Sequence, residues 1–267
     1  MIDSFWLIKY GDVLIRIWYN PEALYSKKPK RFLIICHGCP SHPYDESPAT
    51  NQRFMQDGLV LVYPEYIGTW GSDGQCNFEN AVDTVLKTIK LLRKGAAKDI
   101  NSDHVVNWKA EEIILIGGSF GGSVALVAGA KSGFIKKIVA ISPVTDWRTH
   151  NKSGFKEEDL AHVWKIIKEG LNNYWRARKQ DYARLMKGEL DLNPVDYIGI
   201  LKEKNTFLIH GIYDKDVNYR RSENFHKQLR RGSGRHKIYL SRQKGHIVTR
   251  HLSEGQYYKK VIKWINS

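Results

Sequence analysis

Long apolar runs are missing from this sequence of 267 residues. A membrane-spanning helix needs about 20 consecutive apolar residues, and no stretch approaches that length. The first nine residues lack the basic region and the small-residue cleavage site of a secretory signal. Cysteine is scarce, at three residues, and an odd number argues against a disulfide framework and for a reducing compartment. We therefore expect a cytoplasmic protein without a membrane span.

Internal repeats and low-complexity tracts are also missing. The composition, 42% hydrophobic and 26% charged, is that of an ordinary globular protein and excludes a disordered chain or a collagen-like repeat. A chain of this size can bury a large core without disulfides or metals. Because α/β folds often exceed 200 residues as one unit, we expect residues 1–267 to form a single domain.

Acidic residues are few in the C-terminal quarter. Residues 200–267 contain 16 basic and 5 acidic residues, so most of the net charge of +14 lies there. An excess of positive charge favours binding to nucleic acid, to an anionic membrane surface or to an acidic substrate, but net charge alone specifies no partner. No motif that reads RNA or DNA accompanies it, and aromatic residues are not interleaved with it. We expect no specific nucleic-acid partner.

Strand and helix patterns alternate along most of the chain. The segments Phe5–Tyr10 and Val13–Tyr19, separated by Gly11-Asp12, predict an opening β-hairpin. Apolar and β-branched runs predict strands at 31–36, 59–63, 113–116, 137–141, 207–209 and 237–240. Helical periodicity predicts helices at 49–56, 77–94, 120–130, 220–231 and 254–265. This order predicts a mostly parallel sheet with helices on both faces and antiparallel strands at one edge.

One stretch interrupts the alternation. Residues 146–205 show helical patterns at 157–171 and 174–186 and no strand pattern. We interpret this stretch as a helical, cap-like insertion over the ends of the strands, within the same domain.

The segment Gly117-Gly118-Ser119-Phe120-Gly121 has the pattern G-x-S-x-G. It follows a buried strand pattern and opens a helical one, which is the context of a nucleophile elbow. In such a turn the serine hydroxyl projects from a strained backbone, and Gly117 and Gly121 let strand and helix approach closely. The segment therefore predicts Ser119 as a nucleophile.

A serine needs a base and an orienting acid, which in this type of fold follow it in the order acid, then histidine. His246 follows the strand at 237–240 and is the favoured base; His210 and His226 are disfavoured, and His251 is an alternative. Asp214 follows the strand at 207–209 and is the favoured acid. Asp216, which a turn also explains, and Asp146 are the alternatives.

The segment His37-Gly38-Cys39-Pro40 follows an early strand. Elbow hydrolases take one oxyanion donor from the residue after the serine and another from an early loop of this His-Gly type. The backbone N–H groups of Cys39 and Phe120 are therefore the predicted oxyanion hole.

The pair Cys36 and Cys39 also forms a C-x-x-C pattern. A redox site would place Cys36 at an exposed helix start, but here it ends a buried strand. A haem site needs histidine after the second cysteine, where Pro40 stands, and Cys76 alone cannot complete a zinc site. We expect neither a metal nor a redox role, and no cofactor motif occurs elsewhere.

These segments together resemble the α/β-hydrolase superfamily, and within it the catalytic domain of prolyl-oligopeptidase-type serine hydrolases. The elbow around Ser119 is similar to theirs, and His210-Gly-Ile-Tyr-Asp214-Lys-Asp-Val217 resembles their acid loop, whose first aspartate matches Asp214. The segment Tyr63-Pro-Glu-Tyr66-Ile67-Gly68 resembles their Asn-Tyr-Arg-Gly segment, with Ile67 in place of arginine. The resemblance covers about residues 30–265 and implies an eight-stranded sheet with antiparallel first strands.

The resemblance implies acyl transfer on a small ester or a short peptide. Peptidase members carry a β-propeller for which this chain has no room, and standalone domains of this type are often carboxylesterases. A carboxylesterase is therefore the favoured function, with an aminopeptidase-like or oligopeptidase-like hydrolase second. A non-catalytic binding protein on a hydrolase fold is the alternative from another class.

Overall fold

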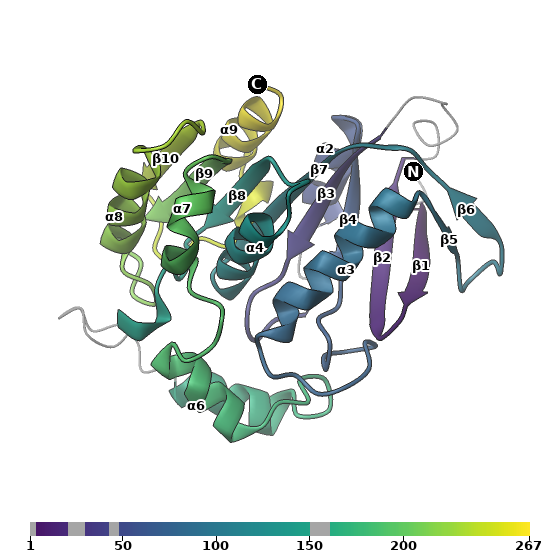
Figure 1. The fold of residues 1–267 in the computed structure, drawn as a ribbon, viewed down its shortest axis with the longest axis horizontal. Helices are drawn as coiled ribbons and strands as arrows, with labels where there is room; N and C mark the ends of the chain where they lie inside the picture. Colours follow the sequence, from purple (N-terminus) through teal and green to yellow (C-terminus); the bar gives the residue numbers. More distant parts are fainter. Residues whose placement is uncertain (1–3, 21–29, 43–47, 150–160) are drawn as a thin grey trace.

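The computed structural model of the chain describes residues 4–20, 30–42, 48–149 and 161–267. Its centre is an eight-stranded sheet in the order β1-β2-β4-β3-β7-β8-β9-β10 (Figure 1). The strands are β1 Ser4–Tyr10, β2 Val13–Tyr19, β3 Lys30–Cys36, β4 Leu59–Pro64, β7 Ala110–Gly118, β8 Lys137–Ile141, β9 Asn205–Gly211 and β10 His236–Ser241. No helix in these ranges is both long enough and apolar enough to span a bilayer.

The sheet is parallel from β4 to β10 and antiparallel at one edge. β1 and β2 form the predicted hairpin, and β2 pairs antiparallel with β4. Every later neighbour pair is parallel. The carboxyl ends of β3, β7, β9 and β10 therefore lie at one edge of the sheet, where open α/β sheets place their sites.

Helices cover both faces of the sheet, as predicted. One face packs against α3 (Asn80–Lys94), α4 (Phe120–Lys131) and α8 (Tyr219–Leu229), and the other against α2 (Pro48–Gln56) and α9 (Gly255–Ile265). In Figure 1, α3 and α4 cross in front of the strands. The central strands serve both layers: on β3, Phe32 and Ile34 belong to one core and Leu33 and Ile35 to the other. Burial on both faces explains their unbroken apolar sequence.

The sequence missed some elements. A short antiparallel ribbon of β5 (Ala96–Lys98) and β6 (Val105–Asn107) lies outside the main sheet. Its strands have three residues each, too few to show an alternating pattern. A 3-10 turn at Pro194–Tyr197 and helix α7 (Ile198–Leu201) were also not predicted. Outside residues 146–205, the predicted strands and helices are confirmed, with bounds shifted by a few residues.

The helical insertion is only partly as expected. Within the predicted helix at 157–171, residues 157–160 lie outside the described residues, and α5 (Ala161–Lys165) continues as a π-helical turn to Gly170. The predicted helix at 174–186 is wrong at its start, because α6 begins at Lys179. Trp175 is instead fully buried and bridged to Thr69, so tertiary contacts override a local pattern that also suited a helix. Figure 1 shows α6 at the bottom of the view, below the ends of the strands.

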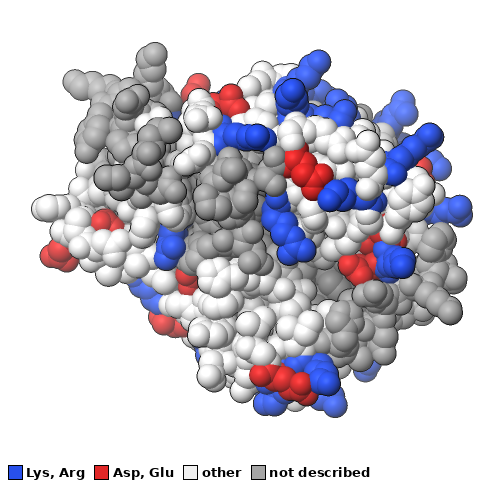
Figure 2. Space-filling model, turned by 180° about the vertical axis from the view of Figure 1, so that it is seen from behind, with Lys and Arg blue, Asp and Glu red and all other residues white. Residues whose placement is uncertain are grey.

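The basic C-terminal quarter forms one side of the molecule. Seen from behind, in Figure 2, more of the lysine and arginine side chains lie toward the side of α8, β10 and α9, and acidic side chains are interspersed among them. Lys244, for example, lies 2.9 Å from Glu254, both partly exposed. The positive charge is therefore spread over a mixed surface.

Candidate active site

Ser119 occupies the turn between β7 and α4. Its φ of 55° lies in the left-handed region, which residues other than glycine rarely adopt. Its N–H donates to the carbonyl of Ile141 on β8 at 2.8 Å, and its carbonyl accepts from the N–H of Gly122 at 3.0 Å. These bonds hold a strained conformation that leaves the half-buried side chain at the start of α4.

The glycines around Ser119 are required by close backbone contacts. A Cβ on Gly121 would lie 2.0 Å from the carbonyl oxygen of Cys36, and one on Gly117 would lie 2.2 Å from the carbonyl oxygen of Gly121. The helix start therefore packs directly against the end of β3. This contact brings the loop after β3, which contains Cys39, beside the elbow.

Cys39, Ser119 and Phe120 line one small cavity of about 40 Å³. No hydrogen bond from the backbone N–H of Cys39 or of Phe120 is recorded among the described residues. The role of these two N–H groups as an oxyanion hole stays a prediction from the sequence.

The loop that contains Cys39 is anchored by Tyr66. The Tyr66 hydroxyl donates to the carbonyl of His37 at 2.9 Å, and the two rings stack at 3.9 Å. Burial lowers the pKa of His37 to about 3, so its ring is neutral. The sequence predicts Tyr66 only as part of a segment that resembles the family, because its anchoring role depends on this contact with a residue 29 positions away.

Asp214 and His246 are joined directly. Nδ1 of His246 lies 2.8 Å from Oδ2 of Asp214, and 3.7 Å from Oδ2 of Asp216. Oδ1 of Asp214 accepts from the backbone N–H groups of Asp216 and Val217, each at 2.9 Å. Of the two candidate acids, Asp214 is therefore the buried carboxylate that makes the hydrogen bond.

These contacts set the charges of the pair. Burial alone would raise the pKa of Asp214, but the hydrogen bonds from His210 and His246 hold it well below its usual range. Burial alone would lower the pKa of His246, but the Asp214 carboxylate, helped by the charge of Asp216, raises it despite Arg250. The result is an ionised acid beside a basic imidazole.

The histidine loop packs against both the elbow and the end of β9. A Cβ on Gly118 would lie 3.1 Å from the N atom of Thr249, and one on Gly211 would lie 2.1 Å from the carbonyl oxygen of Gly245. His246 is thereby held on the same side of the sheet as Ser119. No hydrogen bond joins the side chains of Ser119 and His246, both of which lie in the described part of the chain; catalytic hydrogen bonds often tighten only in the substrate complex.

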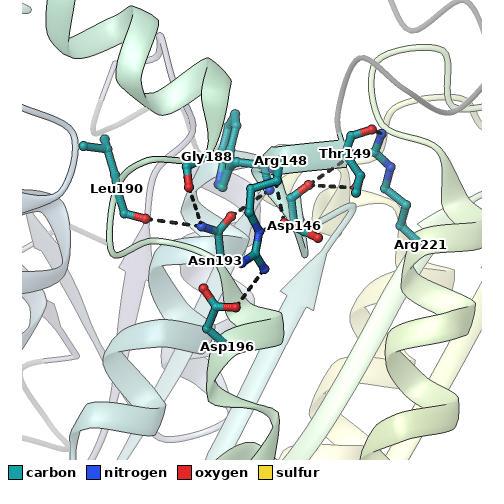
Figure 3. Close-up of polar contacts among 9 residues, drawn as sticks. Asp146, Arg148, Thr149, Gly188, Leu190, Asn193, Asp196 and Arg221 are labelled. Carbon is teal, nitrogen blue, oxygen red and sulfur yellow. Dashed lines mark hydrogen bonds and ion pairs between the residues drawn. The ribbon is translucent and has the colours of Figure 1, made fainter.

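The other candidate residues have different partners. His226 lies on α8, and Nδ1 of His251 accepts from the N–H of Val248 at 3.0 Å. Asp146 binds Arg148, whose Nε lies 2.8 Å from its Oδ1, and Arg148 also binds Asp196 at 2.7 Å. Figure 3 shows Asp146 within this network, with Arg221 bonded to the backbone of the same segment. Within the described residues, His226, His251 and Asp146 make no hydrogen bond or ion pair with Asp214, whose side-chain partners are His210 and His246.

The cavity beside Ser119 is mainly apolar. Its walls come from the loops after β3, β8 and β9 and from the helical segment, and consist of Cys39, Phe120, Val144, Trp147, Val163, Tyr182, Leu185, Met186, Asp216 and Val217 besides Ser119. Tyr182, Leu185 and Met186 belong to α6. Described residues of the segment that follows β8 thus form part of the wall of the cavity beside the candidate nucleophile.

The cysteines remain thiols in this structure. Cys36 and Cys76 are buried, and all three cysteines are free. Burial raises the pKa of Cys76 to about 12 and that of Cys39 well above its usual value, which disfavours a reactive thiolate. Within the described ranges, only Asp214, Asp216 and His246 form a group with metal-ligand spacing, within 4.8 Å, and the imidazole Nδ1 already binds Asp214.

Comparisons with solved structures identify the fold. An esterase of Pyrococcus furiosus aligns with a TM-score of 0.68 at 15% identity, over 99% of this chain and 90% of that one. Est1E from Butyrivibrio proteoclasticus aligns with a TM-score of 0.65 at 18% identity, over 99% of this chain and 100% of that one. The acylaminoacyl peptidase of Pyrococcus horikoshii aligns with a TM-score of 0.65 at 16% identity, over 99% of this chain but 41% of that one. The chain has the α/β-hydrolase fold that these proteins share.

The sequence comparisons identify the family. A search of curated proteins found no match. The sequence profile of the prolyl oligopeptidase family matches residues 47–267, which include the elbow, the acid loop and the histidine loop. The chain therefore belongs to the prolyl oligopeptidase family, a family of hydrolases with the α/β-hydrolase fold.

Proposed function

We propose that this protein is a serine hydrolase that cleaves carboxylic esters through an acyl-enzyme, with Ser119, His246 and Asp214 as its catalytic triad. The observation that carries the proposal is the 2.8 Å contact between His246 and Asp214, on a loop packed against the elbow of Ser119. A neutral imidazole oriented by a buried carboxylate is the base that a serine nucleophile requires.

The proposed reaction has two halves. Nε2 of His246 takes the proton of the Ser119 hydroxyl while Oγ attacks the ester carbonyl carbon, and the N–H groups of Cys39 and Phe120 stabilise the resulting oxyanion. Collapse breaks the bond to the alcohol, which leaves with the proton from His246. A water molecule, deprotonated by the same imidazole, then attacks the acyl group and frees Ser119.

Two observations favour esters over peptides. The cavity at Ser119 is small and mainly apolar, which suits a short acyl group better than an extended peptide. This chain also spans 90% and 100% of the two esterase-type neighbours, but 41% of the acylaminoacyl peptidase. Peptide hydrolysis is the second candidate, because the family contains peptidases.

The test is active-site labelling combined with a substrate panel. A fluorophosphonate should label the native protein and not Ser119→Ala, whereas Ser132→Ala, at the far end of α4, should label normally. Ser119→Ala should lower kcat on p-nitrophenyl acetate by about 10³-fold or more. Faster turnover of aminoacyl p-nitroanilides than of esters would favour the peptidase. Absence of both labelling and turnover would favour a non-catalytic binding protein.

A further inference from the structure

His210 is a buried histidine that the reaction above does not use. It is the last residue but one of β9, and its side chain is fully inaccessible to solvent. Both ring nitrogens have partners: Nδ1 lies 2.7 Å from the hydroxyl of Ser222, and Nε2 lies 2.9 Å from the carbonyl oxygen of Val217 and 3.1 Å from Oδ2 of Asp214. The candidate acid thus lies between two imidazoles.

The partners of His210 determine its tautomer. Nε2 faces two oxygen atoms that can only accept, a carbonyl and an ionised carboxylate, so Nε2 must carry a proton. Nδ1 faces a hydroxyl, which can donate. A ring with the proton on Nε2 is compatible with all three contacts, those to the Val217 carbonyl, the Asp214 carboxylate and the Ser222 hydroxyl.

With this tautomer, four N–H groups surround the Asp214 carboxylate. Oδ1 accepts the N–H groups of Asp216 and Val217, and Oδ2 accepts His246 Nδ1–H. The Nε2–H of His210, which bonds to the Val217 carbonyl, also lies beside Oδ2, with its nitrogen 3.1 Å away. The two backbone bonds fix the position of the carboxyl group, and the two imidazoles fix the direction of Oδ2. Bonds to a charged acceptor are stronger than bonds between neutral groups, so rotation of Oδ2 away from His246 is opposed from both sides.

We propose that His210 is a positioning residue for the Asp214–His246 pair, holding Oδ2 of Asp214 toward the base through the Nε2–H that lies beside it. The inference rests on the proposed function, because it assigns a role within that triad. Ser222 of α8 contributes to this arrangement, since its hydroxyl lies 2.7 Å from Nδ1 of His210 and can donate to that nitrogen when the proton is on Nε2.

His210 also affects the base electrostatically. Its N–H draws negative charge from the oxygen that faces His246, so its removal leaves more charge there and favours the imidazolium. The other charged groups that act on His246 are Asp216, which favours the imidazolium, and Arg250, which opposes it. Neither changes when His210 is replaced. Loss of His210 should therefore shift the acid limb of the kcat/KM profile to higher pH.

The experiment compares His210→Leu with His210→Gln. Leucine removes the donor, whereas the glutamine amide can place an N–H near the position of Nε2 and cannot ionise. We expect His210→Leu to lower kcat on p-nitrophenyl acetate about 10-fold or more with KM changed less than about 3-fold, and to raise the midpoint of the acid limb. His210→Gln should recover most of kcat and the native midpoint. His226→Gln, on α8 without a contact to Asp214, is the matched control.

A second measurement does not depend on a folded variant or on activity. In the ¹⁵N-histidine-labelled native protein, NMR should show a proton on Nε2 of His210. A ring protonated at Nδ1 alone, or a His210→Leu enzyme with native kcat and native pH profile, would overturn the inference. A native protein that neither labels with fluorophosphonate nor hydrolyses any substrate would instead overturn the proposed function.

Discussion

Oδ2 of Asp214 and Nδ1 of His246 lie 2.8 Å apart, although 32 positions separate the residues in the sequence. They belong to loops that follow β9 and β10, which are neighbouring parallel strands. Asp216 is in the same loop as Asp214, yet its carboxylate is 3.7 Å from the same nitrogen and is partly exposed. The geometry thus separates two acids that lie two residues apart.

The different distances of Asp214 and Asp216 from His246 predict that matched Asp→Asn substitutions at the two positions will have unequal effects. Asp214→Asn removes the charge that orients the base and should lower kcat/KM on p-nitrophenyl acetate by about 10³-fold or more. Asp216→Asn should cost less than about 10-fold, because its oxygen is beyond hydrogen-bond distance. Steady-state kinetics of both variants decide the point, and the reverse order would move the acid to Asp216.

The pH dependence should reflect the raised pKa of His246. The base must be neutral to accept a proton, so kcat/KM should rise with pH through the pKa of His246 in the free enzyme. Because Asp214 and Asp216 raise this pKa, the midpoint should lie above the ordinary value of about 6.5. Asp216→Asn should lower the midpoint, and Arg250→Ala should raise it. A flat profile between about pH 5 and 8 would contradict a histidine base.

The cavity predicts a preference for short acyl groups. Met186 on α6 lines it beside Ser119, so Met186→Ala should enlarge it. We expect the ratio of kcat/KM for a p-nitrophenyl hexanoate over the acetate to rise about 5-fold or more, in line with the effect of one methylene in an apolar pocket. Lys187→Ala, on the exposed neighbour, is the control. An unchanged ratio would show that the acyl group binds elsewhere.

The contact between the elbow and the end of β3 predicts a sensitive glycine. A Cβ at Gly121 would overlap the carbonyl oxygens of Cys36 and His37, at 2.0 and 2.6 Å. Gly121→Ala should therefore displace the loop that contains Cys39 and lower both Tm and kcat. Gly133→Ala, where a Cβ meets nothing within 4 Å, should change neither. Thermal unfolding and kinetics are measured on both, and equal behaviour would argue against the close packing.

The basic C-terminal quarter predicts at most non-specific binding to nucleic acid. Duplex DNA binding in about 50 mM salt should fall steeply by about 200 mM salt, because it rests on counterion release. Fluorescence anisotropy with two unrelated duplexes of equal length measures this. Tight binding that survives the higher salt, or that favours one duplex, would show that the charge serves nucleic acid.

The sequence alone determined the layered sheet and the placement of the elbow. Each buried strand or helix shows its burial in its own sequence, as an apolar run or as helical periodicity. Such local patterns predicted β3, β7, β8 and α3. The G-x-S-x-G segment around Ser119 could also be interpreted as a nucleophile elbow from the sequence, because its strand, tight turn and helix are contiguous in the chain. Likewise, Asp214 and His246 could be proposed because each follows a strand whose carboxyl end lies at the same edge.

Only the tertiary structure decided which polar groups meet. Motif position in the sequence favoured Asp214 over Asp216 as the acid. The position of His210 in the chain order disfavoured it as the base, and no other role for it was predicted. The contact of His210 with Asp214 depends on the path of a loop and on Ser222, twelve residues further along the chain. In the same way, the extended segment around Trp175 follows from its pairing with Thr69. Contacts between distant segments leave no periodicity in the sequence, so the polar geometry of the site is known only once the chain has folded.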